Sequence, residues 1–122
     1  MTSALNWFEI PVANLDRAQP FYEALLGQPL RREAMGPGHT LAVLPYAQPG
    51  VGGALLAGGP PPSAQGAIVY LNVGPGLDAA LARGLAAGGQ QLGPVVDLPG
   101  DMGRFVHLLD VEGNRIGLHA HR

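Results

Sequence analysis

The sequence predicts an α+β fold of two βαβββ modules whose mixed sheets curl into a partly open cup. Three observations predict it. The same order of elements, one strand, one helix and three strands, occurs twice along the chain. The two halves overlay at matching places, such as Leu15-Asp16 with Leu77-Asp78 and Gly27 with Gly89. The 19 glycines and 12 prolines among 122 residues favour many turns and short strands.

The first module is expected over residues 1–58. Trp7–Val12 is short, apolar and aromatic, which predicts a strand. A helix follows, because Asn14 is a good N-cap, apolar residues recur at helical spacing, and Gly27 tolerates the left-handed conformation at a helix end. Pro20 lies inside this helix and predicts a kink or a late start. Gly-Pro-Gly and Gln-Pro-Gly turns then separate three predicted strands: Pro29–Met35, His39–Tyr46 and Val51–Ala57.

The second module is expected over residues 66–122, after a Gly- and Pro-rich linker at 58–65. It begins with the β-branched and aromatic strand Ala67–Val73. Leucines and alanines from Leu77 to Leu85 mark a helix face, and Gly88-Gly89 ends the helix. Three further strands are predicted at Gln91–Asp97, Arg104–Asp110 and Arg115–Ala120. Both modules together fit one domain.

Composition excludes several classes of function. The formal net charge of −2 is too small to favour nucleic acid or an anionic membrane as a partner. Neither a transmembrane segment nor a signal-peptide pattern is evident. The absence of cysteine excludes thiolate nucleophiles and thiolate metal sites and fits a cytoplasmic location, while the absence of lysine excludes a Schiff base.

Three segments resemble the vicinal oxygen chelate (VOC) superfamily. The stretch from Val12 to Gly27 is similar to the family's valine, aspartate, leucine, phenylalanine-tyrosine and leucine-glycine pattern. Val51–Leu55 resembles its fourth strand, and Asp110–Ile116 resembles its closing hairpin. The superfamily includes glyoxalase I, bleomycin- and fosfomycin-resistance proteins, epimerases and extradiol dioxygenases, so the resemblance implies a fold and leaves the reaction open.

The resemblance also implies positions for a divalent metal ion at the centre of the cup. The first-strand ligand position falls on Trp7, the fifth-strand position near Ile68 and the eighth-strand position on Gly117. The fourth strand, Val51–Ala57, has no His, Asp, Glu or Gln. Because these side chains cannot coordinate a metal, we expect the family's usual metal site to be absent and no cofactor to be needed.

Strand alternation predicts a different, polar cluster in the cup. Trp7 and Glu9 share one face, as do Tyr70 and Asn72, and a tight final hairpin would place His107 opposite Gly117. The predicted ligand-binding residues are Trp7, Glu9, Tyr70, Asn72, Phe105, His107 and His119. Such a cluster is typical of small-molecule sites.

Three interpretations of this cluster remain open. The polar groups can simply pair with one another inside the fold. They can bind an organic ligand stacked near Trp7 or Phe105. They can also be catalytic, in one of two ways. Glu9, His107 and His119 can form a displaced metal site. Alternatively, Glu9 can act as a general base with His107 or His119 as the partner acid, of which His107 is preferred.

The first functional hypothesis is a resistance-type protein that binds a small organic molecule without a metal. One alternative is a metal-dependent glyoxalase-like lyase or dioxygenase with relocated ligands. The other is a structural subunit with no ligand of its own. The resemblance also implies a homodimer, because a second subunit often completes the site in this superfamily.

Overall fold

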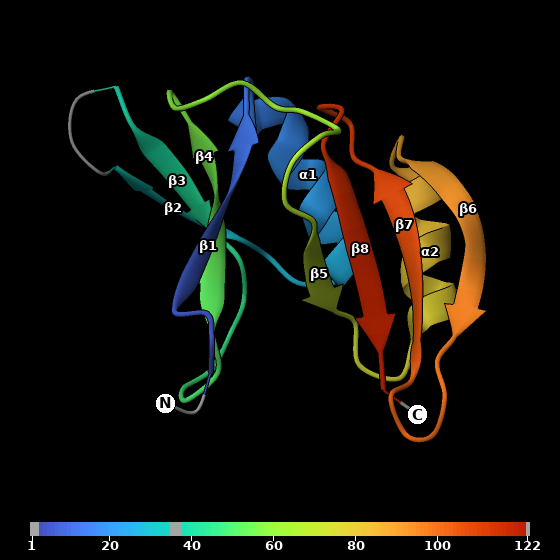
Figure 1. Cartoon of the computed structure of the whole chain (residues 1–122). Coiled ribbons are helices and arrows are strands. Elements are labelled where there is room, and N and C mark those ends of the chain that lie inside the picture. The colour runs from blue at the N-terminus through green and yellow to red at the C-terminus, as the bar shows by residue number, and fades with distance from the viewer. Residues whose placement is uncertain (1–2, 35–37, 122) are drawn as a thin grey trace.

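The computed structural model describes residues 3–34 and 38–121 (Figure 1). Met35 and Gly36-Pro37, which end one predicted strand and begin the next turn, lie outside the described residues. The first module contains β1 (Trp7–Val12), α1 (Leu15–Leu26), β2 (Arg31–Ala34), β3 (Thr40–Val43) and β4 (Gly52–Ala57). The second contains β5 (Val69–Asn72), α2 (Leu77–Ala86), β6 (Gln90–Asp97), β7 (Arg104–Leu109) and β8 (Arg115–Ala120).

Each module builds its own four-stranded mixed sheet. The strand orders are β1-β4-β3-β2 and β5-β8-β7-β6, so β1 and β5 are corresponding edge strands. Each of them runs parallel to the last strand of its module, and the other pairs are antiparallel. The predicted α+β class with two βαβββ modules is confirmed, and the sheets do not close into a barrel (Figure 1).

Helix α1 begins and ends where the sequence predicts. The Asn14 side chain accepts a hydrogen bond from the Arg17 N–H at 3.3 Å, and Gly27 ends the helix with a φ of 70°. The helix begins at Leu15, so the alternative of a late start because of Pro20 is wrong.

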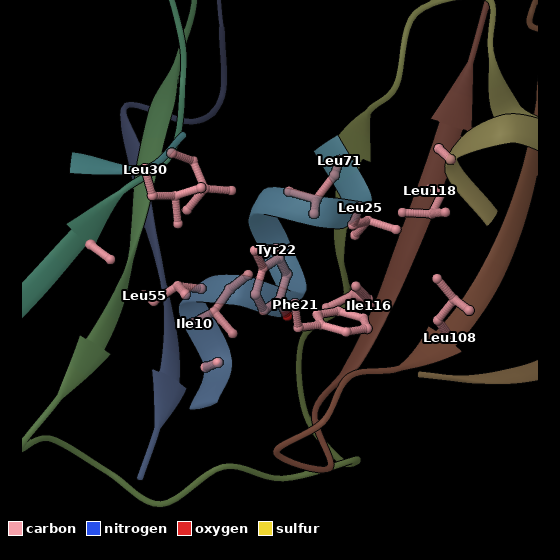
Figure 2. Close-up of a cluster of buried hydrophobic side chains, with 14 of the residues drawn as sticks. Ile10, Phe21, Tyr22, Leu25, Leu30, Leu55, Leu71, Leu108, Ile116 and Leu118 are labelled. Carbon is pink, nitrogen blue, oxygen red and sulfur yellow. The ribbon is translucent and has the colours of Figure 1, made fainter. Parts of the chain in front are cut away.

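The hydrophobic core forms around α1, which lies between the two sheets (Figure 2). Ile10 and Leu55 of the first sheet and Ile116 and Leu118 of the second are all buried in one cluster with this helix. Phe21, Tyr22 and Leu25 of α1 are almost fully buried as a result. The other face of each sheet therefore turns away from α1, and these two open faces carry the predicted site residues.

A buried polar network in the β7–β8 turn ties the two modules together. Asp110 accepts hydrogen bonds from the Tyr22 hydroxyl at 2.5 Å and from the Asn114 backbone N–H at 2.9 Å. The Asn114 side chain donates to the Pro11 carbonyl at 2.7 Å, and Glu112 forms an ion pair with Arg17 at 2.9 Å. The turn, which belongs to the second module, thus binds the end of β1 and the start of α1 in the first module.

Candidate ligand-binding site

The open face of the second sheet brings together most of the predicted site residues. In the strand register Tyr70 is paired with Gly117, and Gly117 with His107, as the sequence predicts for the final hairpin. In the next row Asn72 is paired with His119, and His119 with Phe105. Since paired residues point to the same side of a sheet, these two rows form one continuous surface.

Tyr70 lies flat on this surface because Gly117 has no side chain. A Cβ atom at Gly117 would lie only 2.3 Å from Cδ2 of the Tyr70 ring and 2.6 Å from its Cε2. The first sheet repeats the arrangement, since a Cβ at Gly52 would lie 2.4 Å from the Tyr46 ring. In both modules a tyrosine ring thus fills the space above a glycine of the last strand.

His107 is hydrogen-bonded through both ring nitrogens. Its Nδ1 accepts from the Arg115 guanidinium, at 3.0 Å from Nε and 2.8 Å from the terminal nitrogen. Its Nε2 lies 2.7 Å from the Tyr70 hydroxyl oxygen. Burial, and secondly the neighbouring positive charge of Arg115, lower the pKa of His107 below its usual 6.5. The neutral imidazole is therefore favoured in the folded protein.

Three rings form an aromatic corner beside this histidine. The Tyr70 and Phe105 centroids are 5.7 Å apart with an edge-to-face angle of 86°. His107 lies 5.4 Å from Tyr70 and 5.5 Å from Phe105. Tyr70 nevertheless remains 48% exposed, so its ring and hydroxyl are accessible to a ligand.

The open face of the first sheet holds Trp7 and Glu9. The Trp7 indole N–H donates to the Glu9 carboxylate at 3.4 Å, and its ring meets the edge of Tyr46 at 6.1 Å. Both Trp7 and Glu9 are exposed. They belong to the first sheet, so strand pairing does not bring them beside His107 or His119 of the second sheet.

The predicted cluster is thus only partly assembled within one chain. Tyr70, Phe105 and His107 meet, whereas His119 pairs with the Met102 carbonyl at 2.7 Å. The Asn72 side chain accepts from the Gly74 N–H at 2.8 Å, which forms a local turn. Both nitrogens of His107 have partners on the second sheet, Tyr70 and Arg115, so its role as the partner acid of Glu9 stays a prediction.

A cavity of about 860 Å³ opens where the edge strands β1 and β5 separate. Glu9 and Phe8 of β1 and Tyr70 and Asn72 of β5 line its walls. Leu25 and Leu26, at the end of α1, complete a mainly apolar lining. Glu9 and Tyr70 therefore border the same space, although they belong to different sheets. The volume suits a small organic molecule.

The metal ion that the resemblance implies does not fit these residues. Trp7, Ile68 and Gly117 offer no donor, and the Tyr70 ring fills the space that a side chain at Gly117 would enter. Among residues 3–34 and 38–121, no three His, Asp or Glu side chains lie close enough to share an ion. The alternative ligand set of Glu9, His107 and His119 does not form such a group in the described structure and stays a prediction.

Arg115 and Tyr46 contribute to the two faces but were missed from the sequence. Alternation along the last strand places Arg115 on one face with Gly117 and His119, but Arg115 was not named as a site residue. Its alternation with Gly117 and His119 was the available signal, because these residues share one face of β8. Tyr46 follows β3, and no periodic pattern indicates that it folds back over Gly52.

Solved structures with the same fold are similar to the whole chain. A glyoxalase/bleomycin resistance protein from Albidiferax ferrireducens aligns with a TM-score of 0.74 and 22% identity, covering 98% of this chain and all of the other. TnmS3, an antibiotic binding protein from Streptomyces sp. CB03234, aligns with a TM-score of 0.70 and 24% identity over 100% and 99% of the two chains. Glyoxalase I from Zea mays aligns with a TM-score of 0.68 and 24% identity. The alignment covers 95% of this chain and 45% of the maize chain.

These likenesses establish the VOC fold for this chain. Because the sequence identities are below 25%, these likenesses show the fold alone. No family model and no curated protein matches the sequence. No helix in the described part of the chain has the length and hydrophobicity needed to cross a membrane.

Proposed function

We propose that this protein binds a small planar organic molecule by stacking and hydrogen bonding, without a metal ion. The observation that carries the proposal is the Tyr70 ring lying over Gly117. The position that resembles the metal-ligand position of the eighth strand now supports an aromatic surface. Phe105 and His107 extend that surface, and the polar groups of Tyr70 and Arg115 can orient a ligand on it.

The similar structures support this proposal by their stated functions. One is an antibiotic binding protein and another a glyoxalase/bleomycin resistance protein. A ligand of that general kind, apolar and conjugated with a few polar atoms, suits the aromatic corner. The open cavity of about 860 Å³ argues against a purely structural subunit, which would be expected to fill its own cup.

The proposed binding unit is a homodimer. Within one chain Trp7 and Tyr70 belong to the edge strands of two separate sheets. A second copy would enclose a ligand by setting the Trp7 face of one chain opposite the Tyr70 face of the other. Trp7, 38% exposed, and Tyr70, 48% exposed, would then gain the burial that aromatic side chains favour.

Two measurements test the proposed function. Elemental analysis of the native protein should find less than stoichiometric divalent metal, and stoichiometric metal retained after mild purification would contradict the proposal. Calorimetric titration with 2-acetylnaphthalene, a small planar probe, should show saturable binding that weakens when Tyr70→Ala removes the ring. Analytical ultracentrifugation should give twice the chain mass, and a single-chain mass would remove the dimer.

A further inference from the structure

The hydrogen bonds of His107 fix which of its nitrogens carries the proton. An arginine guanidinium can only donate, so Nδ1, which faces Arg115 at 2.8 and 3.0 Å, must present its lone pair. The lowered pKa of His107 agrees with a neutral ring. In a neutral imidazole whose Nδ1 is an acceptor, the proton resides on Nε2.

This tautomer determines the role of the Tyr70 hydroxyl. Nε2 of His107 must donate to the Tyr70 oxygen, which lies 2.7 Å away. The phenolic hydrogen is therefore directed elsewhere. His107 is the hydrogen-bond partner of this hydroxyl within residues 3–34 and 38–121, and no second one accepts its hydrogen. Tyr70 as a residue is 48% exposed, so its phenolic hydrogen is open to a ligand on this face of the second sheet.

The three residues form a chain of donors that ends at the ligand. Arg115 donates to His107, and His107 donates to Tyr70. Each bond in such a chain polarises the next, so the positive charge of Arg115 strengthens Tyr70 as a donor. The geometry points to Tyr70 as an obligate hydrogen-bond donor that selects planar ligands carrying an acceptor oxygen, such as a conjugated carbonyl. This inference rests on the proposed function and adds the chemical class of the ligand.

A matched pair of probes isolates that hydrogen bond. 2-Acetylnaphthalene and 2-isopropenylnaphthalene have the same shape, but only the ketone has an acceptor oxygen. The wild-type protein should bind the ketone more tightly than the alkene by roughly two- to tenfold, the effect of one hydrogen bond. Tyr70→Phe keeps the ring over Gly117 but removes the hydroxyl, so the ratio of the two affinities should fall to about one. Leu85→Ala, a change at an exposed side chain of α2, should leave the ratio unchanged.

The outcomes separate this inference from the proposed function. If both probes bind the wild type equally, the inference is overturned while the binding function stands. If neither binds, the proposed function fails and the inference fails with it. Nitrogen-15 NMR gives an independent test, because the inference requires a proton on Nε2 of His107. A signal from the Nδ1–H tautomer would refute it without any ligand.

Discussion

Removing the Tyr22 hydroxyl should destabilise the protein by about 2 kcal/mol, the usual contribution of a hydrogen bond to a charged group. This hydroxyl donates to Asp110 at 2.5 Å, in a site where Tyr22 is fully buried. Burial, followed by the charge of Asp110, raises the pKa of Tyr22 well above 10, so the hydroxyl keeps its proton and remains a donor. In Tyr22→Phe, the same Asp110 oxygen would keep only the Asn114 amide at 3.1 Å. The ring itself would stay packed in the core.

Urea unfolding of Tyr22→Phe measures this loss directly, and a fall in melting temperature of roughly 6–10 °C should accompany it. Tyr46→Phe is the matched control, since Tyr46 is exposed and its change should stay within about 0.5 kcal/mol. A loss below about 0.5 kcal/mol for Tyr22→Phe would refute the reasoning. It would mean that the turn around Asp110 does not depend on this contact between the modules.

Three further predictions concern the turn and the open face of the second sheet. Asn114→Ala removes the donor to Pro11 and should cost about 2–3 kcal/mol in urea unfolding, and an unchanged midpoint would contradict the bridging role. Because the pKa of His107 is lowered by folding, the unfolded chain binds its proton more readily, and the free energy of unfolding should fall as pH drops below about 6.5. Arg115→Met should reduce that fall by removing one of its two causes, and equal pH profiles for the two proteins would refute the assignment. Gly117→Glu should displace the Tyr70 ring and abolish the preference for the ketone. A titration of this variant with zinc should show no stoichiometric binding, because one carboxylate with at most one histidine gives too few ligands.

The elements of the fold could be predicted because each has a local cause. Alternation, helical spacing and turn signals identified each helix and strand that residues 3–34 and 38–121 contain, and β8 has the predicted bounds, Arg115–Ala120. The predicted strand His39–Tyr46 was too long, since β3 ends at Val43, two residues before Pro45. Register across the last hairpin was also predictable, because a short turn fixes which residues face each other, as with His107 and Gly117.

The assembly of the site was predicted less well because it depends on contacts distant in sequence. Whether Glu9 meets His107 depends on how the modules pack around α1, and that packing rests on pairs such as Tyr22 with Asp110. Local patterns predict which residues share a face of one sheet but not how two sheets are oriented. Arg115 was not named as a site residue for a related reason. It acts on the site through His107, because its hydrogen bond to Nδ1 leaves the proton of the neutral ring on Nε2.

The lack of a donor side chain at residue 117 and the aromatic surface beside it have the same cause, which is the glycine at that position. A side chain at residue 117 and the Tyr70 ring cannot occupy the same space, because their atoms would lie 2.3 Å apart. Glycine at this position therefore does more than remove a donor atom, since it lets the ring settle beside His107. Once there, the Tyr70 oxygen accepts a hydrogen bond from the Nε2–H of His107, so its own hydrogen is directed away from that ring. In the proposed function, recognition at this surface would depend on the direction of hydrogen bonds rather than on metal coordination. Arg115, the first donor of the chain, would set that direction.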